Sequence, residues 1–255
     1  MTTPTLPLEA PIHMVAPPHS ATLMLMANTV LVLLALWGVL RHWRQTGSAV
    51  GFWLLLGGTL CTLNEPIVDV VGKVWFPTFG NTPLLTAWGV SIPIYMLPVY
   101  CWYVGGQAFL SYRMCQQGLT LPGLYRRYAT FAGVNVLLEV PPIVLGMYSY
   151  YGHQPFVLLG FPVWWTFCNA LMPMVMGGLV YRLEPLLHGW RQVLIVPLAW
   201  MVAAAVNGAV GAPTWLALNL TGTTPWLTHL AAVASLGLGL LTCYGLGLLV
   251  VARAR

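Results

Sequence analysis

Two carboxylates, Glu65 and Asp69, lie four residues apart within a largely apolar segment of this chain. A separation of four places both side chains on one face of a helix, about 6 Å apart. Two like charges at this distance, partly out of water, do not both ionise easily, so one carboxyl group is expected to keep its proton. A protonated acid beside an ionised one forms a proton donor and acceptor pair. This spacing therefore indicates general acid/base chemistry.

A third acid, Glu139, lies in another apolar segment, with Asn135 one helical turn before it and two prolines directly after Val140. Counted from Tyr128 at about 1.5 Å per residue, Glu139 is expected about 16 Å deep, near the middle of a membrane. A carboxylate at such a depth costs roughly 2.5–3.5 kcal/mol and usually faces a cavity. We therefore predict that Glu139 and the first two acids are catalytic and share one cavity.

Amide and aromatic side chains around these acids are predicted to bind a substrate. Several amides near one depth favour a shared cavity over isolated contacts between helices, and flat tryptophan faces can stabilise a cation. His153 follows the segment of Glu139, and a general acid/base role and an interfacial hydrogen bond both remain open for it. The predicted substrate-binding residues are Asn64, Asn135, Asn169, Asn207, Tyr150, His153, Trp88, Trp102 and Trp165.

Composition indicates that lipid surrounds most of the chain. Hydrophobic residues make up 58% and charged residues only 6%, whereas a soluble domain carries about 25% charged residues. The net charge of +5 suits an anionic membrane face and does not indicate nucleic-acid binding. The five cysteines form no CxxC pair, and no three ligands converge, so no metal or other cofactor is predicted. The sequence does not indicate an oligomeric state.

Seven apolar segments predict an all-α, polytopic membrane protein with a bundle of seven transmembrane helices. Each segment has the roughly 20 residues that a span needs, and backbone hydrogen bonds in lipid must close within the segment. Residues 1–20 are rich in proline and are expected to form an extended external tail, and residues 21–255 to form a single domain. The predicted spans are Ala21–Leu40, Val50–Val71, Ile92–Tyr112, Tyr128–Met147, Val157–Tyr181, Val193–Leu216 and Trp226–Ala252.

Basic residues in alternate gaps predict the orientation of these spans. Cationic loops stay cytoplasmic when helices insert, so the N-terminus is expected outside and the C-terminus in the cytoplasm. The expected location is the bacterial plasma membrane. Nine of the ten Lys and Arg residues follow this alternation, with Lys73 as the exception; the nine are Arg41, Arg44, Arg113, Arg126, Arg127, Arg182, Arg191, Arg253 and Arg255.

Small residues predict where helices approach closely. Ser235, Gly239, Cys243 and Gly247 recur every four residues and form a stripe on one helix face. The glycine pairs at 57–58, 105–106 and 177–178 are interpreted in the same way. The connection Lys73–Ser91 is long, aromatic and broken by proline, which is typical of an interfacial anchor or of a lid over the outer end of the bundle.

The motif Glu65-Pro66 followed by Asp69, with Trp88-Gly89 and Ile92-Pro93 further on, resembles the AveC-type spirocyclase family. Members of that family are polytopic membrane proteins associated with dehydration and spiroketal formation on polyketides. The chain is also similar to small seven-span membrane terpene cyclases, which carry a Glu late in the second span, as Glu65 does here. Those enzymes also use an Asp in the seventh span, where this chain has no acid. Both resemblances imply acid-initiated cyclisation of a lipophilic substrate.

The sequence therefore predicts a membrane cyclase whose partners are a lipophilic small molecule and the bilayer. In a proton-coupled transporter or channel, the alternative class, the same acids would relay protons. A retinal-type photoprotein is excluded because the only lysine, Lys73, lies far from the last span. A structural or assembly subunit would not need the acids, and this class stays open as a further alternative.

Overall fold

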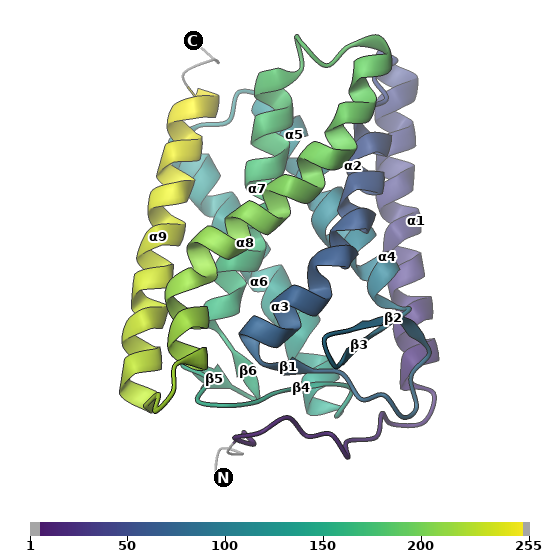
Figure 1. The fold of residues 1–255 in the computed structure, drawn as a ribbon. Coiled ribbons are helices and arrows are strands. Elements are labelled where there is room, and N and C mark those ends of the chain that lie inside the picture. The colour runs from purple at the N-terminus through teal and green to yellow at the C-terminus, as the bar shows by residue number, and fades with distance from the viewer. Residues whose placement is uncertain (1–5, 252–255) are drawn as a thin grey trace.

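The computed structural model describes residues 6–251 and is mostly helical (Figure 1). Within these residues the helices join into seven continuous stretches, which lie side by side in a bundle. The stretches are α1 (Ser20–Thr46); α2 (Val50–Leu60) with a 3-10 segment (Cys61–Asn64) and α3 (Glu65–Gly72); α4 (Met96–Tyr100) with a π-helical segment η2 (Cys101–Gly106) and α5 (Gln107–Gln116); α6 (Leu121–Val144); α7 (Trp164–Leu183); a 3-10 segment (Gly189–Leu194) with α8 (Ile195–Asn219); and α9 (Pro225–Val251).

Four of these stretches are long and apolar enough to cross a membrane, which is compatible with a multi-pass membrane protein. They are Ser20–Thr46, Val50–Gly72, Gly189–Asn219 and Pro225–Val251. Among the described residues, the stretches α4–α5, α6 and α7 are not among the helices that combine the length and the apolar composition of a span. Helix α7 packs against α5, α6, α8 and α9, so it lies inside the bundle, with most of its residues buried.

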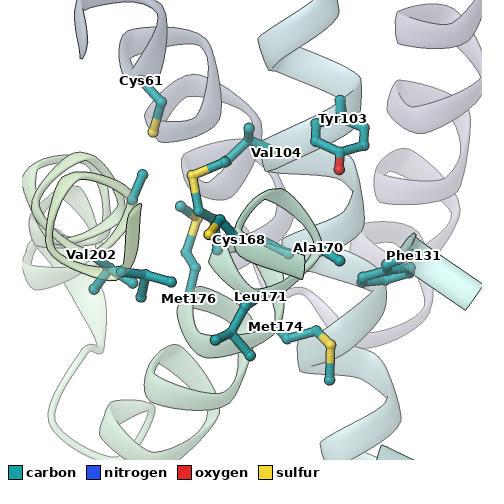
Figure 2. Packing of buried hydrophobic residues seen from close by; sticks show 14 of the residues in the cluster. Cys61, Tyr103, Val104, Phe131, Cys168, Ala170, Leu171, Met174, Met176 and Val202 are labelled. Carbon is teal, nitrogen blue, oxygen red and sulfur yellow. The ribbon is translucent and has the colours of Figure 1, made fainter. Parts of the chain in front are cut away.

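The apolar core is centred on α7 (Figure 2). Figure 2 shows Cys168, Leu171 and Met176 of α7 between Val202 of α8 and Val104 of η2. The predicted close approaches are confirmed. A Cβ added at Gly58 would lie 2.3 Å from the backbone nitrogen of Gly105, so α2 and η2 touch backbone to backbone.

The predicted small-residue stripe on α9 is also confirmed as a packing surface. Ser235, Gly239, Cys243 and Gly247 are all buried. A Cβ added at Gly239 would come within 2.7 Å of the Tyr128 hydroxyl on α6. The stripe therefore lets α9 lie directly against its neighbours, as expected for small residues between membrane helices.

Short strands cover the end of the bundle at which the described chain begins (Figure 1). Within residues 6–251 they form three antiparallel pairs: β1 (Val74–Trp75) with β4 (Ser149–Tyr150), β2 (Pro83–Ala87) with β3 (Val90–Pro93), and β5 (Val157–Leu158) with β6 (Phe161–Pro162). The all-α expectation is thus correct for the bundle and misses these strands. The connection Lys73–Ser91 lies over this end, as expected of an anchor or a lid.

The N-terminal segment crosses the same end. Ala16 donates a backbone hydrogen bond to Phe79 (2.9 Å), and Gly152 donates one to Pro7 (2.8 Å). These bonds fasten the predicted tail to the strand layer before α1 begins. Residues 1–5 of the tail lie outside the described residues, as do Ala252, Arg253 and Arg255 at the other terminus.

Three predicted spans began at the wrong residue, and two of them were expected too early in the chain. The fifth was expected from Val157, but α7 begins at Trp164, because Gly160 (φ +86°) and Leu159 (φ +50°) take left-handed conformations that turn the chain into the β5–β6 hairpin. The third was expected from Ile92, which lies in β3, and the helix starts only at Met96.

The fourth span was expected from Tyr128, but α6 begins seven residues earlier, at Leu121. Thr120 caps this start, its hydroxyl accepting a hydrogen bond from the backbone nitrogen of Gly123 at 3.2 Å. Glu139 therefore lies 18 residues into α6, about 27 Å along it, and only five residues before its last residue, Val144. The expected start of this helix is therefore wrong, and Glu139 lies near the strand-covered end of α6. Its depth in a membrane stays a prediction.

Candidate functional site

Three carboxylates line one cavity inside the bundle, near its strand-covered end. Glu65 and Asp69 come from α3 and Glu139 from α6, and all three line a cavity of about 70 Å³. Glu65 is 7% exposed and Asp69 is 1% exposed. A water molecule needs about 10–15 Å³ of such space, so the cavity holds a few waters or the reacting part of a larger molecule.

A break in the second helical stretch positions the first two acids. The 3-10 segment Cys61–Asn64 ends the α2 geometry, and Pro66 occupies the first turn of α3. Proline is tolerated there because the first amides of a helix have no partner within it. The four-residue spacing then places Glu65 and Asp69 on the same face of α3, as predicted, and this face lines the cavity.

Hydrogen bonds orient two of the carboxylates. The Tyr100 hydroxyl donates to Glu65 Oε2. Glu139 accepts from the Tyr148 hydroxyl at 2.5 Å, from the Tyr150 hydroxyl at 3.2 Å and from Asn135 Nδ2 at 3.5 Å. Glu139 is thus held by donors from α6 itself and from the segment that follows it.

Asp69 is different from the other two acids. Its Oδ2 is buried and has no hydrogen-bond partner within residues 6–251. A buried, unpaired oxygen is costly, and such a group calls for a partner outside the chain, such as a water, a proton or a ligand. Asp69 Oδ2 is therefore available to such a partner in the cavity.

The two tyrosines that bind Glu139 donate hydrogen bonds to it and stay protonated. Burial, and then the Glu139 carboxylate, raises the pKa of Tyr148 well above its ordinary value. The same two causes, in the same order, raise the pKa of Tyr150. Both phenols therefore keep their protons at neutral pH and hold the carboxylate in place.

Aromatic rings form much of the remaining wall. Trp165 stacks on Trp164 with ring centroids 4.5 Å apart, and Phe76 lies 4.9 Å from Tyr148. Trp165, Phe76 and the aliphatic Val99 all line the cavity. Such a wall favours an apolar molecule and can stabilise a transient cation.

A second chamber of about 130 Å³ adjoins the first, and Val68, Tyr100 and Met172 line both. Asn64 and Asn207 lie in this second chamber. Asn64 Oδ1 accepts from Trp200 Nε1 at 2.6 Å, whereas Asn207 Oδ1 is buried without a partner among the described residues. These two predicted binding residues thus line the second chamber and not the carboxylate cavity.

Of the other predicted binding residues, the structure brings Asn169, Tyr150 and Trp165 to the carboxylate cavity. Asn135 is fully buried beside Glu139. It does not line the cavity, so its amide orients the acid.

The expectations for Trp88, Trp102 and His153 require correction. Trp88 is 68% exposed in the β2–β3 turn, at φ +50°. Trp102 turns towards α1, where its Nε1 donates to Asn28 Oδ1 at 2.7 Å. His153 lies in the turn after β4 and is absent from the described cavity lining.

Sequence reasoning missed the tyrosines of the third helical stretch. Tyr95, Tyr100 and Tyr103 all line the cavity. Tyr100 and Tyr103 lie three residues apart, a spacing that puts both on one side of a helix. Three tyrosines within nine residues of an apolar span were the available signal.

Within residues 6–251, no group of three or more His, Cys, Asp or Glu side chains is arranged to hold a metal ion. Comparison of the chain with protein-family models, with curated proteins and with solved structures found no match.

Proposed function

We propose that this protein is an integral-membrane cyclase that closes a ring on a lipophilic intermediate by carboxylic acid/base catalysis. The observation that carries the proposal is the convergence of Glu65, Asp69 and Glu139 on one buried, aromatic-walled cavity. Three carboxyl groups enclosed together do not all ionise, because like charges out of water repel strongly. The cavity thus offers both a proton donor and a proton acceptor in a place that excludes bulk water.

In the proposed reaction Asp69 is the acid, since its Oδ2 has no partner among the described residues. Asp69 gives its proton to an epoxide oxygen, an alkene carbon or a carbonyl oxygen of the substrate. An internal hydroxyl or π bond of the substrate then attacks the carbon made electrophilic, and this step forms the ring. A proton released from the cyclic cation passes to a carboxylate, and the net reaction is an isomerisation.

Spiroketal formation would use the same acid/base steps, but it is a dehydration and not an isomerisation. Two hydroxyl groups of the substrate add to one ketone carbon, and one water leaves. Glu65, oriented by Tyr100, and Glu139, oriented by Tyr148 and Tyr150, are the proposed acceptors of the released proton. The resemblances to AveC-type spirocyclases and to small membrane terpene cyclases support this class of reaction, either on a polyketide or on an isoprenoid chain.

We also propose that all seven helical stretches span a bacterial plasma membrane, with the strand-covered end outside. The basic residues support this orientation: Arg44 lies in the last turn of α1, and Arg113 and Arg182 lie in the last turns of α5 and α7. Positive charge at one end of a bundle favours the cytoplasmic side. Reporter fusions after Thr46 and after Gly72 test this orientation. The reporter fused after Thr46 should be active in the cytoplasm, and the one fused after Gly72 should be active outside.

The test of the cyclase is turnover by purified protein in nanodiscs. Linear dihydroxyketones and epoxidised prenyl compounds are supplied, and cyclic products are separated by mass and retention time. We expect cyclic product from one of the two classes and a loss of roughly 100-fold or more in Glu65→Gln. Glu9→Gln is the matched control, because Glu9 is exposed in the N-terminal segment. Undiminished turnover by Glu65→Gln would refute the assignment.

Proton-coupled transport is the second candidate, and one feature favours it. The 3-10 segment Cys61–Asn64 and the π-helical segment Cys101–Gly106 both interrupt helices next to the acids. Interrupted helices are frequent at functional sites and at the substrate sites of transporters. Uptake of the same compounds into proteoliposomes, driven by a pH gradient and without chemical change, would select transport over cyclisation.

A further inference from the structure

A third hollow, a groove, opens between α1, η2, α5 and α6. This groove has a volume of about 370 Å³, within the range of about 300–1,000 Å³ typical of ligand sites. Among the described residues, its lining shares no member with the carboxylate cavity. Most of its wall is apolar, and Leu34, Gly38, Leu110 and Phe131 are representative.

One polar side chain in this wall lacks the partners it needs. Gln107 is 4% exposed, and neither its Oε1 nor its Nε2 has a hydrogen-bond partner within residues 6–251. Leaving a buried donor and acceptor unpaired destabilises the folded protein. A ligand in the groove that carries a carbonyl or a hydroxyl group would satisfy this amide.

The second polar group of the wall is a cation. Arg127 of α6 lines the groove, and its guanidinium lies 5.3 Å from the Phe131 ring centroid. The described lining includes no acidic residue, so the groove itself offers no counter-charge. An anionic group on the ligand would supply it, and a guanidinium matches a phosphate well.

The order of these groups along the bundle matches a lipid. Arg127 lies six residues after the start of α6, about 9 Å from that end. Gln107 lies nine residues before the end of α5, about 14 Å from the same end of the bundle. Leu31 lies fifteen residues before the end of α1, or about 22 Å. The cation thus lies nearest the end of the bundle and the amide further in, and beyond the amide the described lining is apolar.

We propose that this groove binds one anionic membrane phospholipid. Its phosphate pairs with Arg127, an ester carbonyl accepts a hydrogen bond from the Gln107 amide, and an acyl chain lies against Leu31, Leu34 and Val134. The site is independent of the carboxylate cavity, and the proposal does not depend on the cyclase assignment.

The test is native mass spectrometry of the full chain with phosphatidylglycerol and with phosphatidylcholine of the same acyl chains. We expect phosphatidylglycerol to be retained preferentially, and its affinity to fall about tenfold in Arg127→Gln and in Gln107→Leu. Arg126→Gln is the matched control, because Arg126 is the exposed neighbour and does not line the groove. Equal loss in Arg126→Gln and Arg127→Gln, or equal retention of both lipids, would overturn the proposal.

A filling variant tests the groove without removing a polar group. A Cβ at Gly38 would meet no described atom within 4 Å, so Gly38→Phe adds bulk inside the groove without a backbone clash. Gly133→Phe is its control, because Gly133 is equally open and lies outside the lining. We expect Gly38→Phe alone to expel the lipid. A parallel measurement adds inorganic phosphate to the protein with bound phosphatidylglycerol. Displacement of the lipid by millimolar phosphate would indicate an anion site and overturn the lipid site.

Discussion

The Tyr100 hydroxyl donates a hydrogen bond to Glu65 Oε2, and the Tyr100 side chain lines both chambers of the candidate site. This bond joins the third helical stretch to the broken part of the second. It fixes one carboxylate and leaves Asp69 Oδ2 free. The site is thus organised by a contact between residues 35 positions apart.

Tyr100→Phe removes this bond and keeps the ring. We expect turnover to fall roughly tenfold, because Glu65 loses the donor that orients it. Tyr95→Phe is the matched control, since Tyr95 lines the same cavity and its hydroxyl has no partner among the described residues. Steady-state turnover of the two variants, side by side, checks this. Equal activity in both would show that the bond has no catalytic role.

Tyr148→Phe is expected to lower the free energy of unfolding by about 1.5–3 kcal/mol, the usual worth of a hydrogen bond to a charged group. The bond it removes, 2.5 Å to Glu139, is shorter than the 3.2 Å bond from Tyr150. Tyr150→Phe should therefore cost less. Thermal unfolding in detergent measures both, and a larger loss in Tyr150→Phe would contradict this ranking.

The raised pKa values of Tyr148 and Tyr150 predict a loss of stability at high pH. An unfolded tyrosine ionises near pH 10, whereas burial and the Glu139 carboxylate keep both folded phenols protonated beyond that. Their stabilisation is fully present below pH 10 and is lost as the pH rises through the folded pKa values. Unfolding midpoints between pH 8 and pH 11 should fall more steeply in the parent protein than in the double Phe variant.

Gly58→Ala is expected to destabilise the bundle by about 1–3 kcal/mol. Its new Cβ would lie 2.3 Å from Gly105 N and 2.4 Å from Gly105 Cα, and a backbone cannot rotate away as a side chain can. Gly133→Ala should instead be neutral or slightly stabilising, because its Cβ meets no described atom within 4 Å and alanine favours a helix. Unfolding of the two variants in the same detergent checks the contrast.

The pairing of Glu65 with Asp69 could be predicted because it depends only on the helical repeat, which the local sequence determines. The small-residue stripe on α9 could be predicted for the same reason. The start of α6 could not, because two adjacent arginines, Arg126 and Arg127, are typical of a cytoplasmic loop between spans. Both instead lie inside α6, which starts at the Thr120 cap. Arginine is a good helix former, so its charge marks a membrane boundary better than it marks a helix end.

Contacts distant in sequence account for the rest of the site. Tyr148 and Tyr150 reach Glu139 because β4 pairs with β1, and nothing in either short segment specifies the other. Trp88 was expected at the substrate because it follows the Glu65 motif in an aromatic stretch. The tight β2–β3 turn points it outward instead.

The most direct measurement of the central claim is the rate of ring closure by Asp69→Asn in nanodiscs, measured beside Glu9→Gln on the substrate that the parent protein cyclises. Asparagine keeps the shape of the side chain and removes its acidic proton. The account predicts a rate at least 100-fold lower for Asp69→Asn and an unchanged rate for Glu9→Gln. A correctly folded Asp69→Asn variant that closes the ring at the parental rate would contradict it.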